Sequence, residues 1–134
     1  MKRFYHHLAV MAAAAVVSAM FLAGCAQREE FQTVEEAVNG GAVLGENINI
    51  DGLDVSGMGV LEARKLLRAE QQKRVDAFEI TFSAGERSHT VRGNELRIEF
   101  NTDQVLLEAL ALPPKKLFAE PEERKLSCAA SVPA

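Results

Sequence analysis

Short alternations of polar and apolar residues recur along the middle of the chain. Phe78, Ile80 and Phe82 alternate with polar residues, which is the two-residue period of a half-buried strand. A short turn at residues 84–86 predicts that the strand returns as a hairpin. The segments that we expect to form strands are 47–50, 78–82, 88–91 and 96–100.

Two other stretches carry apolar residues at helical spacing. In residues 60–73, Val60, Ala63 and Leu67 form an apolar stripe opposite charged residues. We expect this stripe to pack against the apolar face of the 78–82 strand. A second helix is predicted to start at Asn101, with Gln104 as its capping partner, and to end at the proline pair that follows Leu112.

The order of these elements is strand, helix, strand, strand, short strand, helix. It predicts an α+β fold, in which a small mixed domain has an antiparallel sheet with two helices packed on one face. We place this domain at residues 45–112. Residues 113–134 contain prolines, charges and small residues and are predicted to be a flexible tail.

The N-terminus has the features of an export signal. Lys2 and Arg3 precede an uncharged run over residues 8–23, which is shorter than the roughly 20 apolar residues of a membrane-spanning helix. The residues that end this run, which resemble the lipobox of bacterial lipoproteins, are Leu22, Ala23, Gly24 and Cys25. The resemblance implies that 1–24 is a lipoprotein signal peptide. It also implies that the Cys25 thiol carries the lipid, with palmitate-type acyl chains that hold the chain on the extracytoplasmic face of the cell membrane.

Residues 25–44 are polar and acidic, and we expect them to be a lipidated N-terminus and tether. An alternative is a short helix docked on the domain, because Phe31, Val34 and Val38 have helical spacing and two glycines follow Asn39.

A turn-rich stretch after the first strand carries a family resemblance. The run from Asn49 to Met58, followed by Glu62 and Ala63, resembles the opening of the YoaR-like peptidoglycan-binding domain. That family occurs beside VanW-type and L,D-transpeptidase domains in Gram-positive envelope proteins. Its order of elements also fits residues 45–112. The residues singled out as a signature turn and as candidate wall contacts are Asn49, Asp51, Gly52, Asp54, Ser56 and Gly57. Their side chains and backbone angles favour a role in stabilising the turn first.

Charge and chemistry narrow the function. The chain has 15 Lys and Arg and 19 Asp and Glu residues, and loss of Lys2 and Arg3 with the signal leaves 13 basic residues and a net charge near −6. That charge disfavours nucleic acid as a partner. His89, the only histidine after the signal, lacks a partner motif, and Cys128 lacks the context of a transpeptidase nucleophile. We therefore expect no catalytic site, no metal site and no cofactor.

Three functions remain open at this point. The first is a membrane-anchored envelope lipoprotein with a non-catalytic module that binds peptidoglycan. The second is a structural or adaptor lipoprotein that contacts another envelope protein. The third is a truncated fragment of a larger VanW-type or L,D-transpeptidase protein, which would have no activity alone.

Overall fold

The chain separates into two units, Met1–Glu30 and Phe31–Ala134. The computed structural model describes residues 30–114, 118, 120 and 122–133. Apart from Glu30, all of these belong to the second unit. The predicted signal peptide and the Leu22–Cys25 motif lie outside the described residues.

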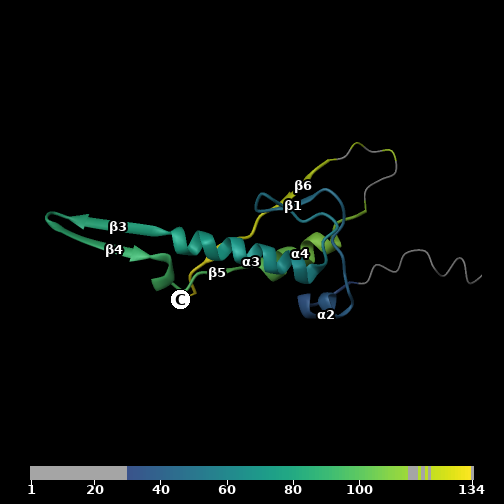
Figure 1. The fold of residues 1–134 in the computed structure, drawn as a ribbon, viewed down its shortest axis with the longest axis horizontal. Helices are drawn as coiled ribbons and strands as arrows, with labels where there is room; N and C mark the ends of the chain where they lie inside the picture. The colour runs from purple at the N-terminus through teal and green to yellow at the C-terminus, as the bar shows by residue number, and fades with distance from the viewer. Residues whose placement is uncertain (1–29, 115–117, 119, 121, 134) are drawn as a thin grey trace, which may run out of the picture. The chain divides into compact units, whose positions relative to one another are not determined.

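The second unit is an α+β domain, as predicted (Figure 1). Its helices and strands, in chain order, are α2 (Val34–Asn39), β1 (Ile48–Ile50), β2 (Leu53–Asp54), α3 (Val60–Ala77), β3 (Glu79–Ala84), β4 (Arg87–Arg92), a 3-10 turn (Gly93–Glu95), β5 (Glu99–Phe100), α4 (Thr102–Ala111), β6 (Arg124–Leu126) and β7 (Ala130–Ser131). The described strands form three small sheets, with the orders β2-β1-β6, β3-β4 and β5-β7. All pairs are antiparallel except β1 with β6, which is parallel.

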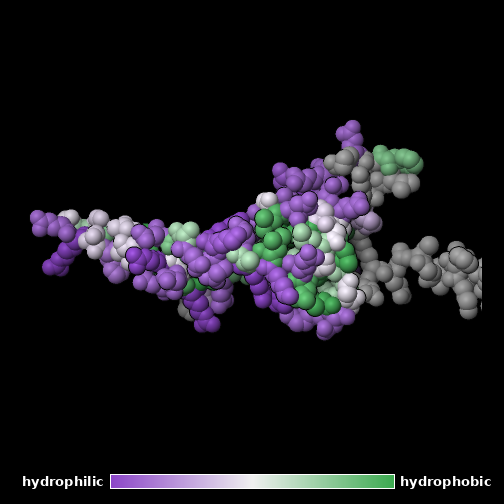
Figure 2. Space-filling model, in the orientation of Figure 1, coloured by the Kyte–Doolittle hydropathy of each residue, from purple (hydrophilic) through white to green (hydrophobic). Residues whose placement is uncertain are grey.

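The core lies among α2, α3, α4 and β1. The predicted stripe of α3 is buried, with Val60, Ala63 and Leu67 each at most 1% exposed. Ile48 and Ile50 from β1 are also buried, as their alternation predicted. The remaining buried apolar residues are Val34, Ala37, Leu44, Val55, Val105, Leu106 and Ala109. In Figure 2 the hydrophobic residues gather on this body, whereas the hairpin at the left shows mostly polar surface in that view.

The prediction that residues 25–44 are a tether is wrong for the part after Phe31. Residues of α2 and of the loop behind it belong to the core, since Val34, Ala37 and Leu44 are at most 2% exposed. Thr33 caps the helix, because its Oγ1 accepts a hydrogen bond from the Glu36 backbone N–H at 3.2 Å. The alternative, a short helix docked on the domain, is correct. Burial of its apolar face offsets the low intrinsic stability of a six-residue helix.

The prediction of a flexible tail over 113–134 is also wrong for its second half. β6 pairs with β1, and β7 pairs with β5. Leu126 and Cys128 pack against the core. Strands of two and three residues are too short to leave a periodic pattern in the sequence, so the composition alone suggested a tail.

The hairpin β3–β4 forms as predicted, but its apolar residues do not face the stripe of α3. Phe78, Ile80 and Phe82 are 37%, 41% and 61% exposed. The hairpin continues from the end of α3 beyond the other elements (Figure 1). Gly93 allows this junction, because a Cβ at that position would clash with the Val75 carbonyl oxygen.

Two details of the second predicted helix and its preceding strand differ. The predicted 96–100 strand shortens to Glu99–Phe100, and residues 96–98, which follow the 3-10 turn, are not in a strand. Asn101 is the N-cap residue of α4, as predicted, but its side chain makes no capping bond, since its Oδ1 accepts instead from the Ala129 N–H at 2.6 Å. Gln104 donates to Glu108 rather than forming a capping pair.

Candidate functional site

The signature turn is held by a hydrogen-bond network around Ser56. Its Oγ accepts from the Ile48 N–H at 3.1 Å, and its backbone N–H donates to Asp54 Oδ1 at 3.0 Å. The hydroxyl also lies 2.5 Å from the same carboxylate oxygen. These bonds favour the ionised carboxylate, so the pKa of Asp54 lies below its ordinary value, with the Ser56 hydroxyl as the largest cause.

The apolar residues of the turn fasten it to the core. Val55 is fully buried, and Leu53 and Met58 pack against the core cluster. Gly52 and Gly57 have φ angles of 84° and 68°, in the left-handed region that favours glycine. The conformation of the signature turn therefore depends on its buried apolar residues and on glycine at positions 52 and 57.

Asp51 belongs to the interior rather than to the surface. We predicted Asp51 as a candidate wall contact, but its side chain is only 8% exposed. Its Oδ1 accepts from the Cys128 N–H at 2.9 Å, and its Oδ2 lies 3.8 Å from Arg74 Nη1. The carboxylate therefore joins the end of β1 to the C-terminal segment and to α3.

The Cys128 thiol lies in this same cluster. Burial, with the negative charge of Asp51 as the next cause, raises the pKa of Cys128 to about 11. The thiol therefore stays protonated near neutral pH, and a nucleophilic role does not fit its surroundings.

Of the candidate contacts, Asp54 and Ser56 border a shallow hollow beside the turn. Asp54 is exposed and Asn49 is half-buried. The hollow is lined by Asn47, Ile48, Asp54, Ser56 and Glu123. Sequence reasoning missed Glu123, because it lies in the predicted tail, and no local pattern connects residue 123 with residue 54. With Asp54 and Glu123 in its wall, the hollow is suited to hydrogen-bond donors such as hydroxyl and amide groups.

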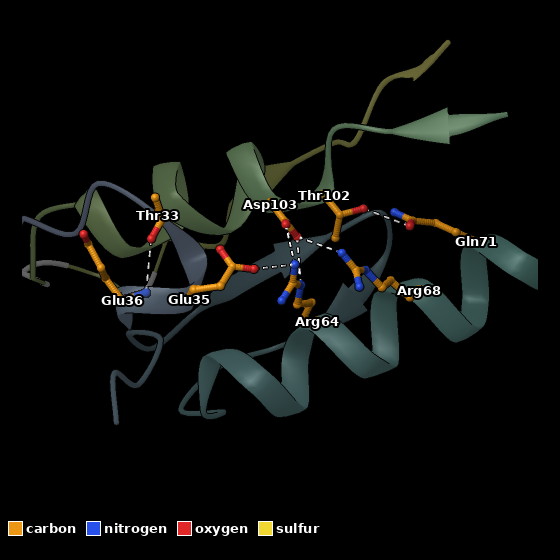
Figure 3. Close-up of polar contacts among 8 residues, drawn as sticks. All are labelled: Thr33, Glu35, Glu36, Arg64, Arg68, Gln71, Thr102 and Asp103. Atoms are coloured by element: carbon orange, nitrogen blue, oxygen red, sulfur yellow. Dashed lines mark hydrogen bonds and ion pairs between the residues drawn. The ribbon is translucent and has the colours of Figure 1, made fainter. Parts of the chain in front are cut away.

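A second polar cluster joins α2, α3 and α4 (Figure 3). Arg64 on α3 donates through Nε to Asp103 Oδ1 at 2.9 Å and through Nη2 to Glu35 Oε1 at 3.0 Å. Arg68 adds a longer bond of 3.3 Å to the same Asp103 oxygen. The hydrogen bond with Asp103 is the largest cause that raises the pKa of Arg64 above its ordinary value. This arrangement pairs the charges with one another and holds α2 and α4 on α3, which is a structural role.

The remaining chemically reactive side chains form no site among the described residues. His89 lies exposed on β4. Within the part of the chain that the structure describes, no group of three His, Cys, Asp or Glu side chains is arranged to hold a metal ion. Among the described helices, none combines the length and apolar character needed to cross a membrane.

Comparison with known proteins gives no relative. The chain matches no protein-family model, no curated protein and no solved structure.

Proposed function

We propose that this protein is an envelope lipoprotein, anchored in the membrane through Cys25, whose domain is a non-catalytic module that binds peptidoglycan. The observation that carries the anchor is the Leu22–Cys25 motif at the end of an uncharged run. The observation that carries the module is the resemblance of residues 49–63 to the YoaR-like family. Both come from the sequence, and the hollow beside the signature turn offers a surface on which wall contacts are chemically reasonable.

The chemistry of that surface sets the kind of binding expected. Peptidoglycan carries hydroxyl and amide N–H groups, which are donors for the carboxylates of Asp54 and Glu123. A net charge near −6 after signal removal opposes long-range attraction to anionic wall polymers. Affinity therefore rests on local hydrogen bonds, and we expect it to be weak, on the order of micromolar to millimolar. Anchoring beside the wall offsets this weakness by raising the effective concentration.

The binding test is a pull-down of the full chain on insoluble wall sacculi. Glu123→Gln removes a carboxylate from the hollow, whereas Glu122→Gln makes the same change on the neighbouring exposed residue, which does not line it. We expect the first variant to bind less and the second to bind as the parent does, with little effect of added salt. Equal binding by both variants, or binding that moderate salt abolishes, would place the contact elsewhere.

The anchor has its own test. Cys25→Ser removes the thiol that takes the lipid, so labelling by a fatty-acid analogue should be lost and the unprocessed precursor should accumulate. Cys128→Ser is the matched control, because it removes the other cysteine of the chain and should leave labelling unchanged. Label that persists in the Cys25 variant contradicts the anchor.

An adaptor role is the second candidate function. The observation that favours it is the β3–β4 hairpin, whose apolar residues are exposed. Exposed apolar side chains gathered on one face are typical of protein contact surfaces. A chain that fails to bind sacculi but co-purifies with an envelope protein through this hairpin would support the adaptor role.

A further inference from the structure

The β3–β4 hairpin is a two-stranded sheet with two distinct faces. Residues directly opposite one another share a face, so Ile80 lies beside Val91 and Phe82 beside His89 on the apolar side. The other face is polar and internally satisfied, as the 2.8 Å bond between the hydroxyls of Thr81 and Thr90 shows. An isolated two-stranded sheet is only marginally stable in water. Pairing with another strand would therefore stabilise this hairpin.

The outer edge of β3 is unpaired among the residues that the structure describes. Gly93 N–H donates to the Phe78 carbonyl at 2.8 Å. This bond shows which residues of β3 form hydrogen-bonded pairs with β4, since such pairs alternate with non-hydrogen-bonded ones. Even-numbered residues of β3 therefore direct their backbone groups toward β4. Glu79, Thr81 and Ser83 direct theirs outward, and no described strand pairs with them. Proline and β-bulges, which commonly block such edges, are absent from β3.

The free edge of β4 is less suited to pairing. Its outward Arg92 N–H is already bonded to Glu95 Oε2 at 2.8 Å. The strand also carries Arg87, His89 and Arg92, so pairing it with its own copy would bring these basic side chains together. β3 has a single charged residue, Glu79.

We infer that the free edge of β3 pairs antiparallel with β3 of a second copy of this chain, about a two-fold axis through Thr81. In this register Thr81 lies opposite Thr81 of the second copy, and Glu79 lies opposite Ser83 of the second copy. The outward backbone groups then match, and no like charges face each other. The product is a four-stranded antiparallel sheet with the order β4-β3-β3-β4.

The side chains favour the same register. Ile80 lies opposite Phe82 of the second copy in a non-hydrogen-bonded pair, where opposing side chains come closest. Both residues are on the apolar face and are 41% and 61% exposed in the single chain. Pairing of a β-branched with an aromatic residue across strands stabilises a sheet. The interface is smaller than that of a permanent dimer, so the association is weak and depends on concentration.

Disulfide trapping tests the pairing in the full chain, purified in mild detergent with Cys25 and Cys128 changed to Ser. In Thr81→Cys the two thiols meet at the axis, where Cα atoms about 5.5 Å apart permit a disulfide. Thr90→Cys is the matched control, since Thr90 is the direct partner of Thr81 but lies one strand further out. Three strand spacings, about 14 Å, separate the two copies of residue 90, which is too far for a disulfide. Under mild oxidation we expect dimer from the first variant and little from the second.

The register has a separate readout. A mixture of Glu79→Cys and Ser83→Cys chains should form the mixed disulfide, and neither chain should cross-link well alone. Thr81→Pro should abolish sedimentation as a dimer while keeping the hairpin, because the Thr81 N–H points outward and is not used by β4. Equal cross-linking at 81 and 90, preferential cross-linking at 90, or a chain that stays monomeric at high concentration would each overturn the inference.

Discussion

Because Leu67 is buried, truncating its side chain is the sharpest test of how α2, α3 and α4 pack together. Leu67 on α3 is 1% exposed, whereas Leu61 on the same helix is 45% exposed. The substitutions Leu67→Ala and Leu61→Ala remove the same atoms and change helix propensity equally. The difference between them therefore measures burial.

The expected magnitudes come from that contrast. Loss of three buried carbon groups at about 0.8 kcal/mol each gives roughly 2.4 kcal/mol for Leu67. The cavity that remains adds to this, for a total of about 3–4 kcal/mol, within the range seen for buried leucine truncations. Leu61 keeps nearly half its surface in water, so its truncation should cost about 1 kcal/mol or less. Out of a typical stability of about 5–15 kcal/mol, only the first loss is severe.

Urea unfolding followed by far-UV circular dichroism measures both variants, because the chain has no tryptophan for fluorescence. With a slope of about 1–3 kcal/mol per molar urea, Leu67→Ala should lower the midpoint by about 1–4 M. Equal midpoints for the two variants would refute the assignment of the core. In the hairpin we expect a small effect, because Phe82 is 61% exposed. Phe82→Ala should lower the unfolding free energy by about 1 kcal/mol or less, far below the loss for a core phenylalanine.

Three further substitutions and one control test the polar clusters. Ser56→Ala should raise the pKa of Asp54 toward its ordinary value, measured by NMR titration of the side-chain carboxyl carbon, because it removes the largest cause of the lowering. Since the folded-state pKa of Cys128 is raised from 9.0 to about 11, its contribution to stability is complete below pH 9 and is lost as the pH rises through 11. Cys128→Ser should remove that part of the alkaline decline in denaturation midpoint. Arg64→Ala should lower the unfolding free energy by about 1.5–3 kcal/mol by leaving Asp103 and Glu35 without their shared donor. Lys73→Ala, which breaks an exposed pair, should cost at most about 0.5 kcal/mol.

Local periodicity was enough to predict α3, the strand β1 and the hairpin. The stripe Val60, Ala63 and Leu67 is long enough to set both the helix and its buried face. The periodicity of a segment does not indicate whether another element packs against its apolar face. Phe78 and Phe82 have the alternation of core residues, yet both keep more than a third of their surface exposed among the described elements.

The candidate site was predictable only in part for a related reason. The bonds among Asp54, Ser56 and Ile48 span few residues, so the turn chemistry can be read from the sequence. The partners of Asp51 lie on α3 and near the C-terminus, and nothing local relates them. Its burial therefore became visible only in three dimensions.

The parallel pairing of β1 with β6 has a consequence for how the chain folds. Ile48 pairs with Arg124, so the sheet closes across most of the length of the domain. Closing such a long loop is entropically costly before its contacts form, and folds that depend on distant contacts form slowly. The helices and the hairpin are built from near neighbours and are free to form during synthesis. The central sheet must wait until Leu126 has emerged, so β1 has β2 on one edge but no partner on the other through most of the chain's synthesis, and this interval carries the greatest risk of misassociation.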